Sequence, residues 1–442
     1  MSIRFFSVSV LLLVMFSPQE WWQARQQRRL VTIEAQSEAP DVWVDGDLSA
    51  DCTGGDYDSS SHDCSGDEGN AYDTVAEAIS NADADDVIGI RGASGGFDGS
   101  YESATTRTIS KNLTLEAYGS EEPIIHGTQV PTENEDWQTF VVNGSADVTF
   151  DGLEIHGTRV ELDEDFGHNG ISGDTSGRIT INNCEIHSYN HCGIKGSSKL
   201  TMTDSYIHDI GSVGDIWNDH GVYWTRNGSL GDVVIERNRF DGITGAPFHF
   251  YKAGETCGNF IVRYNTIIGG SVNDNTTWGI LLACSNCLIY NNSIYGVRWG
   301  IIFYQEACED NDIFNNAIHG SSATDFSCDT AGGSAPIGLG NVLANNYYTT
   351  GTDCSSDPPE NIDVAVPPNV FDEGTNPFIA VPDTWDDFRL AADSGAIDAG
   401  DSTLGASHKW GFDPADTTWP PSILDQDLYG DDWEIGAFVY VP

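Results

Sequence analysis

The segments IVRYNTIIGG (261–270), LIYNNSIYGV (288–297) and DIFNNAIHGS (312–321) repeat one pattern at intervals close to the length of one solenoid coil. Each contains a short alternation with β-branched residues, which is typical of a half-buried strand. Similar segments start at residues 148, 179, 200, 233 and 342. Their alignment predicts one inward-facing column: Phe150, Ile181, Met202, Ile235, Val262, Ile289, Ile313 and Leu343. Steps of 21 to 33 residues between column members indicate loops of varying length at the corners of the coils.

An asparagine stands three places after the core residue in five of these segments, at Asn238, Asn265, Asn292, Asn316 and Asn346. Asparagine tolerates the left-handed conformation of a tight corner, so we expect these residues at corners of the coils. There, stacked copies can hydrogen-bond from one coil to the next. The pattern indicates architecture and carries no functional signal.

A second set of strands precedes the first in each coil. Its members begin with a glycine or proline followed by an apolar residue: Gly170-Ile171, Gly193-Ile194, Gly221-Val222, Pro247-Phe248, Gly279-Ile280 and Gly300-Ile301. The apolar residue should point inward, as should the position two residues later. Short strands whose neighbours lie one coil away form parallel sheets. The fold expected is all-β: a single-stranded right-handed parallel β-helix, or solenoid.

The N-terminal end of this solenoid needs a cover, because an unpaired strand edge invites aggregation. Residues 70–92 predict a short amphipathic capping helix from Thr74 to Ala82, followed by a strand.

The stretches YDTVAEAI and DVIGI (within 72–90), FRLAADSGAIDAG (388–400) and DLYGDDWEIGAFVY (427–440) carry a family resemblance. From about Val42 to Pro442 the chain resembles the secreted right-handed β-helix proteins of the pectate-lyase-like superfamily. This resemblance implies a protein that handles polysaccharides. Many activities share these patterns, so they do not choose a substrate.

The chain has 442 residues and a formal net charge of −49. A surface this acidic repels nucleic acid and anionic membranes, which excludes both as expected partners. Solubility in a saline medium explains such a charge, and acidic loops that hold calcium are the alternative.

Residues 1–17 carry Arg4 and then an apolar run of signal-peptide length, too short to span a bilayer. We therefore expect a signal peptide at 1–17, a linker or propeptide at 18–41 and the β-helix domain at 42–442; a short anchor or a misplaced start remains an alternative. The protein should be secreted or lie at the cell surface.

Ten cysteines in an exported protein favour disulfides, and the first candidates are Cys52–Cys64 and Cys328–Cys354.

The outward positions of the second strand set predict a column of neighbouring side chains. Its members are Ser172, Lys195, Tyr223, His249, Leu281 and Ile302, with His168, His191, Asp219 and His220 just before the strands and Arg226 and Lys252 just after them. Six of these residues should cluster within three successive coils: Lys195, His220, Tyr223, Arg226, His249 and Lys252. The two apolar members should end the site.

Basic residues concentrate in the same part of the chain. Beyond the N-terminal segment there are 15 lysines and arginines, and nine of them fall between residues 159 and 263. A basic stripe in an acidic protein focuses anionic ligands. Ordinary surface charges that balance neighbouring acids are the alternative.

The chemistry that fits is β-elimination on a uronic-acid polymer, in which electrostatic stabilisation of the developing dianion should lower the barrier most. A lysine among other cations has a lowered pKa and can act as a base. We assign Lys195 as base, Arg226 and Lys252 to the substrate carboxylate, Tyr223 or His249 as proton donor, and His220 as the residue that orients them. Further substrate contacts are assigned to four residues: His168, His191, Trp278 and Trp299. The alternative is that these residues have no function and are simply exposed strand residues or corner packing groups. A separate set, His156, His187 and His208, is expected to form a structural stack at a corner of the coils.

Family motifs are sparse. IWNDHGVYW (216–224) is similar to the V-W-I-D-H element of pectate lyases, and this resemblance implies a calcium ligand at Asp219. The downstream arginine-proline-arginine motif of those enzymes is absent. GHNGISG (167–173) interrupts the G-H-G element of polygalacturonases with an asparagine. The lysine-plus-arginine arrangement resembles that of the alginate lyase and chondroitinase B family, although the local sequences differ.

The hypothesis is a polysaccharide lyase, acting as a monomer on an anionic polysaccharide, with Ca²⁺ as the one cofactor considered. A glycoside hydrolase would need two carboxylates about 5–9.5 Å apart, and its candidates are Asp174, Asp215, Asp219 and Glu255. A uronan C5-epimerase would use the lyase residues. A non-catalytic carbohydrate-binding or surface protein would have no convergent titratable cluster.

Overall fold

The computed structural model describes residues 39–92, 100–129, 137–159, 168–174, 176–211, 219–226, 228–251, 257–269, 277–303, 308–327 and 341–350, with shorter stretches between 362 and 441. Apart from its first two residues, the described chain belongs to one compact unit, Asp41–Pro442. The predicted signal peptide (1–17), nearly all of the predicted linker (18–41), and the pair Cys328 and Cys354 lie outside the described residues.

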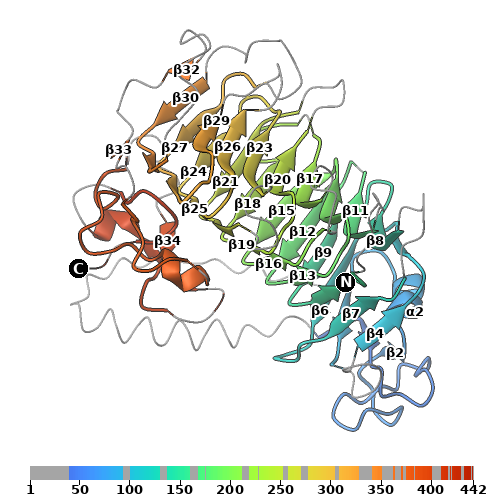
Figure 1. Cartoon of the computed structure of the whole chain (residues 1–442). Helices are drawn as coiled ribbons and strands as arrows, with labels where there is room; N and C mark the ends of the chain where they lie inside the picture. The colour runs from blue at the N-terminus through green and yellow to red at the C-terminus, as the bar shows by residue number, and fades with distance from the viewer. Residues whose placement is uncertain are drawn as a thin grey trace, which may run out of the picture. The chain divides into compact units, whose positions relative to one another are not determined.

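The predicted right-handed parallel β-helix is confirmed (Figure 1). Each full coil adds one strand to each of three sheets, and every strand pair in these sheets is parallel. In spatial order, the 13-stranded sheet contains β2 (Asn70–Tyr72), β1 (Val42–Val44), β3 (Asp86–Ile90), β6 (Leu113–Ala117), β9 (Val148–Asp151), β12 (Arg178–Asn182), β15 (Lys199–Thr203), β18 (Val233–Glu236), β21 (Phe260–Arg263), β24 (Leu288–Tyr290), β27 (Asp312–Phe314), β30 (Asn341–Ala344) and β32 (Ile362–Asp363).

The other two large sheets complete each coil. The 11-stranded sheet contains β4 (Ser100–Ser103), β7 (Ile124–Gly127), β10 (Glu154–His156), β13 (Glu185–His187), β16 (Tyr206–His208), β19 (Arg239–Asp241), β22 (Thr266–Ile268), β25 (Ser293–Tyr295), β28 (Ala317–His319), β31 (Tyr347–Tyr348) and β33 (Val370–Phe371). The 9-stranded sheet contains β5 (Arg107–Ile109), β8 (Trp137–Val142), β11 (His168–Gly173), β14 (Cys192–Gly196), β17 (His220–Trp224), β20 (Ala246–Phe250), β23 (Trp278–Leu282), β26 (Trp299–Phe303) and β29 (Thr324–Ser327). A small antiparallel pair is formed by β34 (Trp410–Phe412) and β35 (Ile423–Asp425).

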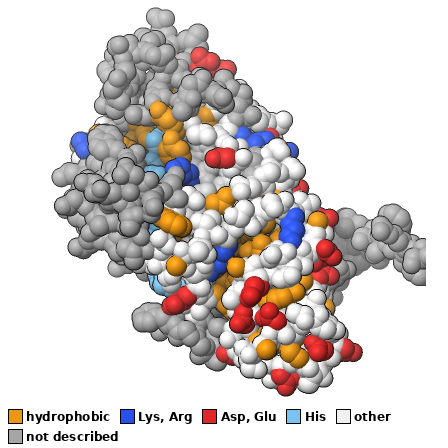
Figure 2. Space-filling model, turned by 90° about the vertical axis from the view of Figure 1, so that its right-hand side faces the viewer, with side chains coloured by type: hydrophobic (Ala, Val, Ile, Leu, Met, Phe, Trp, Pro, Cys, Tyr) orange, Lys and Arg blue, Asp and Glu red, His pale blue; other side chains and the backbone are white. Residues whose placement is uncertain are grey.

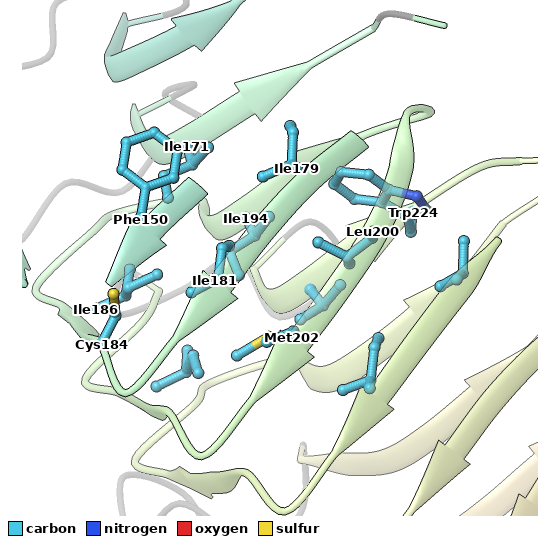
Figure 3. Close-up of a cluster of buried hydrophobic side chains, with 14 of the residues drawn as sticks. Phe150, Ile171, Ile179, Ile181, Cys184, Ile186, Ile194, Leu200, Met202 and Trp224 are labelled. Carbon is cyan, nitrogen blue, oxygen red and sulfur yellow. The ribbon is translucent and has the colours of Figure 1, made fainter. Parts of the chain in front are cut away.

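The inward column predicted from the repeat is confirmed. Its eight members, from Phe150 to Leu343, are paired in unbroken register along the 13-stranded sheet. In Figure 3, Ile181 and Met202 of this column lie in one cluster with Ile194 and Trp224 of the 9-stranded sheet. Complete burial of each such aliphatic side chain stabilises the fold by about 1.5–3 kcal/mol, before conformational entropy is subtracted.

The predicted asparagine ladder is confirmed, with one correction to its backbone. The Asn292 carboxamide oxygen accepts hydrogen bonds from the backbone and side-chain nitrogens of Asn265, at 3.1 and 2.9 Å. Its amide nitrogen donates to the backbone oxygen of Val262. The left-handed residue at each corner is the one before the ladder asparagine, such as Tyr264 or Asn291. The ladder residue itself uses its side chain to satisfy buried backbone groups.

The glycines of the second strand set are explained by close approach between coils. A Cβ atom on Gly193 would lie 2.8 Å from the backbone oxygen of Gly221 in the next coil. The same crowding occurs at Gly170, Gly279 and Gly300. This crowding accounts for the glycine before the inward residue in these coils, whereas Pro247 occupies the equivalent position before Phe248 in β20.

The predicted capping helix is confirmed as α2 (Val75–Asn81), which packs Val75, Ala78 and Ile79 into the end of the core. Thr74 caps its N-terminus by accepting a hydrogen bond from the backbone of Glu77.

The predicted disulfide Cys52–Cys64 is also present. The wider expectation of disulfides is wrong for six described cysteines, which are buried and not disulfide-bonded: Cys184, Cys192, Cys257, Cys284, Cys287 and Cys308.

The C-terminal segment packs against the outer side of the 11-stranded sheet (Figure 1). It includes the 3-10 helices η1 (Trp385–Phe388) and η2 (Gln426–Leu428). Phe388 and Phe438 share an apolar cluster with Ile268 and Ala317 of the sheet. The backbone of Ala437 donates to the Ser293 hydroxyl at 3.0 Å. Among the described residues, no helix is both long and apolar enough to cross a membrane.

Candidate functional site

The outward column predicted in the second strand set lies on the 9-stranded sheet, in the predicted register. Ser172, Lys195, Tyr223, His249, Leu281 and Ile302 pair in this order through β11, β14, β17, β20, β23 and β26. Adjacent strands of a sheet lie about 4.8 Å apart, so Lys195 and Tyr223 are immediate neighbours, as are Tyr223 and His249.

A second column runs beside the first, three residues earlier in each strand. It consists of Asn169, Cys192, His220, Ala246, Trp278 and Trp299. Side chains of the two columns touch: His220 stacks on Tyr223 with ring centroids 5.3 Å apart, and Trp278 packs with Leu281. The face therefore carries two rows of side chains side by side, and the site lies where both rows are polar.

The centre of the site is a pair of histidines from neighbouring coils. Nδ1 of His249 lies 2.9 Å from Nε2 of His220, and the two rings meet nearly at right angles. His220 is 1% exposed and His249 is 7% exposed. One ring donates the hydrogen and the other accepts it.

Burial keeps both histidines neutral. It lowers the pKa of His249 to about 3. Burial, followed by the neighbouring His249 and His191, holds the pKa of His220 well below its usual range. Neither ring is an imidazolium near neutral pH, so this pair acts there by hydrogen bonding.

Tyr223 lies between Lys195 and the histidine pair. Its ring meets that of His249 edge-on at 5.0 Å. Burial raises the pKa of Tyr223, and the nearby Tyr251 adds to the shift. The phenol therefore keeps its proton near neutral pH and can donate it.

Tyr251 is a member of the cluster that the sequence pattern did not reveal. It directly follows β20, and its ring lies 5.3 Å from that of His249 and 6.0 Å from that of Tyr223. Its position in the sequence could have revealed it: Tyr251 stands three residues after the inward-facing Phe248 and directly before Lys252, which was assigned to the site. Aromatic rings of this kind stack on sugar rings as readily as they pack on one another.

Lys195 is half-buried, between Ser172 and Tyr223 in the outward column. The residue pattern predicts several cations around it. The histidine pair supplies none near neutral pH, because both rings are neutral there. The cations expected around Lys195 are therefore the predicted lysines and arginines, and the two histidines add no charge beside it.

Arg226 follows β17 but is bound to other groups. It donates to the backbone oxygen of Ser197 at 3.1 Å and forms an ion pair with Asp232 at 3.3 Å. Its side chain is 17% exposed. The other predicted carboxylate-binding cation, Lys252, lies outside the described residues.

His168 and His191 lie at the N-terminal ends of strands, on the coils before the histidine pair. His168 is 1% exposed and lies edge-on to Tyr189 at 5.1 Å; burial lowers its pKa to about 4. Nδ1 of His191 lies 2.9 Å from the Asn169 carboxamide oxygen. His191 is half-buried and borders the site, whereas His168 is enclosed by the core.

The polar surface ends where the sequence predicted. Leu281 and Ile302 form an outward apolar cluster with Ala246 and Trp278, and Trp299 packs against it. Trp278 is 5% exposed. The guanidinium of Arg298 covers the Trp299 ring at 3.9 Å. In the described residues these tryptophans are thus mainly packing groups at one end of the site.

The predicted calcium ligand is buried. Asp219 is 1% exposed, directly precedes β17, and lies with Thr244 close to Gly211. Among the described residues, it belongs to none of the groups of three ligand atoms close enough to hold a metal ion.

The carboxylate pair required by a glycoside hydrolase is not formed by the two described candidates. Asp174 follows β11, whereas Asp219 precedes β17 two coils away. At about 3.3 Å per strand residue their separation exceeds about 15 Å, beyond the hydrolase range. Asp215 and Glu255 lie outside the described residues.

Charges are unevenly distributed over the face drawn in Figure 2. Acidic side chains gather toward its lower end, where Figure 1 places the N-terminal strands. Lysine and arginine side chains occur singly among uncharged and apolar surface higher up. The strongly negative net charge is therefore not spread evenly over this face.

Comparisons with known proteins agree with the fold. A family model described as a right handed beta helix region matches residues 138–350. Pectate lyase Pel9A superposes with a TM-score of 0.55 at 16% sequence identity, covering 92% of this chain and 98% of that one. A PL6 alginate lyase complexed with a trisaccharide gives a TM-score of 0.31 at 13% identity, covering 81% and 93% of the two chains. Comparison with curated protein sequences found no match. At such low identity, the likeness to Pel9A shows a shared fold.

Proposed function

We propose that this β-helix protein is an exported polysaccharide lyase that cleaves a uronic-acid-containing polymer by β-elimination. The observation that carries the proposal is the adjacency of Lys195 and Tyr223 on the outward face of the 9-stranded sheet. These two side chains offer a base and an acid on neighbouring strands. The fold shared with pectate lyase Pel9A supports a polysaccharide as substrate.

Two proton transfers are needed. Lys195, in its amine form, removes the C5 proton while the bond from C4 to the leaving oxygen breaks and a C4–C5 double bond forms. Tyr223 gives its phenolic proton to the leaving oxygen. Tyr223 suits this role because its raised pKa keeps it protonated. Solvent then returns a proton to Tyr223 and accepts the one held by Lys195.

The neutral histidine pair would position Tyr223 in this scheme. His220 stacks on the phenol ring, and His249 contacts the same ring edge-on. The low pKa of His249 argues against the alternative in which this histidine donates the proton. In this scheme both histidines are positioning residues.

The substrate carboxylate needs a cation, because charge develops on it as the C5 proton leaves. Arg226 and Lys252 remain the predicted groups, and Arg226 would have to exchange Asp232 for the substrate. Calcium at Asp219 likewise stays a prediction, and no step above depends on it.

The test is the ultraviolet absorbance of the unsaturated uronate product, measured with pectate, alginate, glucuronan, ulvan and glycosaminoglycans. We expect a rise with one of these polymers, and a loss of at least about a hundredfold in Lys195→Ala, as is typical when a catalytic base is removed. Tyr223→Phe should lower kcat much more than it changes KM. Lys111→Ala is the matched control, since Lys111 lies near the N-terminal cap and donates to the backbone oxygen of Ser80 at 3.3 Å.

Absence of a rise on every polymer would reject the lyase. Full activity in Lys195→Ala would reject the assignment of the base. An epimerase would give no absorbance change but would incorporate solvent deuterium at C5. A hydrolase would release reducing ends without absorbance.

A further inference from the structure

A ladder of stacked histidines lies on the 11-stranded sheet, away from the proposed catalytic face. The last outward positions of β10, β13 and β16 are His156, His187 and His208, which confirms the stack predicted from the sequence. Their ring centroids lie 4.4 and 4.6 Å apart, and the planes are within 19° of parallel. His126 of β7 extends the stack by one ring. His156, His187 and His208 end their strands, and none of the four histidines takes part in the proposed lyase chemistry.

Glutamates on the same strands reach from one coil to the next. The carboxylate of Glu154 lies 3.1 Å from Nε2 of His187. One coil further, the carboxylate of Glu185 lies 2.8 Å from Nε2 of His208. Each glutamate stands two residues before a histidine on its own strand and contacts the histidine of the next coil diagonally, beside a column of stacked histidines.

We propose that Glu154, His156 and His187 form a binding site for a divalent transition-metal ion of the zinc type. One ligand atom from each of these residues lies within 4.8 Å of the others. Imidazole nitrogen with carboxylate oxygen is a donor set that suits zinc and its neighbours. The ion would replace the hydrogen that now joins Glu154 to His187. Because the two imidazole rings stack nearly parallel 4.4 Å apart, both must rotate out of the stack to ligate it.

The neighbouring set, Glu185 with His187 and His208, is less suitable for an ion. Nδ1 of His208 lies 2.8 Å from Asp209, and its Nε2 lies 2.8 Å from Glu185. Both nitrogens of His208 therefore already face carboxylates. Because His187 belongs to both sets, they cannot be filled independently, and we expect one ion per chain at the ladder.

The surroundings attract cations. A surface hollow of about 390 Å³ adjoins the ladder, and four acidic side chains line it: Glu122, Glu154, Glu185 and Asp204. The one basic residue in its lining, Arg239, is occupied by Asp241 at 3.0 Å and by the Tyr206 ring. Asp204 is paired with Arg237 at 2.8 Å, so the carboxylates of Glu122, Glu154 and Glu185 are the ones that attract a dication to this hollow.

Calorimetric titration of tag-free protein, stripped with EDTA and dialysed, with Zn²⁺ tests the proposal. We expect saturable binding of one ion at the ladder. His156→Gln and Glu154→Gln should each weaken binding at least tenfold, as should His187→Gln. Two variants serve as matched controls and should change affinity less than threefold: His208→Gln, in the neighbouring set, and His319→Gln, on β28 and bonded to Thr349. Circular dichroism verifies that each variant is folded.

Co²⁺ in place of Zn²⁺ gives a second readout, since its visible spectrum reports nitrogen ligation. Loss of that spectrum in His156→Gln would support the site. Unchanged zinc affinity in the three ligand variants would overturn it, as would the absence of saturable binding. Loss of binding in His208→Gln with retention in His156→Gln would overturn this choice of ligands.

Discussion

His249 and His220 share one hydrogen across 2.9 Å between neighbouring coils, in a place where both rings are almost completely buried. A second proton at this contact would set two N–H groups against each other. Burial and the shared hydrogen bond therefore both favour the neutral state of the pair. Protonation of either ring should destabilise the fold.

The stability of the fold should fall as the pH drops from about 6.5 toward 3, partly because of His249. The unfolded chain binds a proton near the ordinary pKa of 6.5, whereas the folded protein binds it only near 3. Since the unfolded state takes up more protons in this window, acid favours unfolding. At about pH 4.5 this residue should cost about 2–3 kcal/mol relative to neutral pH.

His249→Gln checks this expectation, because glutamine keeps a donor and an acceptor but does not titrate. Urea unfolding across this pH range should show a shallower loss of stability in the variant. Equal acid sensitivity of the variant and the unsubstituted protein would contradict the role given to His249.

Asn292→Ala should destabilise the fold by about 2–4 kcal/mol. The substitution leaves the buried backbone N–H of Asn265 and the backbone oxygens of Val262 and Tyr290 without their side-chain partner. Asn81→Ala is the comparison, since Asn81 is exposed and makes one hydrogen bond, to Glu77. Urea unfolding should show a shift of less than about 1 kcal/mol for Asn81→Ala. Similar shifts in the two variants would mean that the ladder is not a major source of stability.

Gly193→Ala should destabilise the protein by about 1–3 kcal/mol, because its methyl group would press on the backbone oxygen of Gly221. That oxygen belongs to the next coil, and it cannot move without disturbing the strand pairing. Gly92→Ala is the matched control: among the described residues, a Cβ there would meet only the flexible Glu121 side chain, at 3.7 Å. Thermal unfolding compares the two variants, and an unaffected Gly193→Ala protein would refute the close-approach explanation.

The repeat made the columns of the β-helix predictable. Once Phe150 and Ile181 are aligned as equivalent positions, every other position follows, since parallel coils pair at constant register. The same alignment predicted that Lys195 lies beside Tyr223 and that the polar part of the outward column ends at Leu281. These predictions required only the positions of residues along the strands.

Partners outside the repeat could not be predicted in this way. Arg226 was expected to face the substrate, but Asp232, in the following loop, holds it. Tyr251 was missed because it lies one residue past the strand. The buried thiols were expected in disulfides because of the inferred export. Cys284 and Cys308 instead point into a core that covers them completely.

The sequence alone determined the solenoid, its register, its N-terminal cap and the strand face that carries Lys195, because all of these follow from periodic alternation along the chain. Only the tertiary structure decided which side chains of that face carry charge and which groups they bind. Charge depends on burial, and burial depends on neighbours one coil away. The neutral His220–His249 pair and the Glu154–His187 contact are products of that stacking.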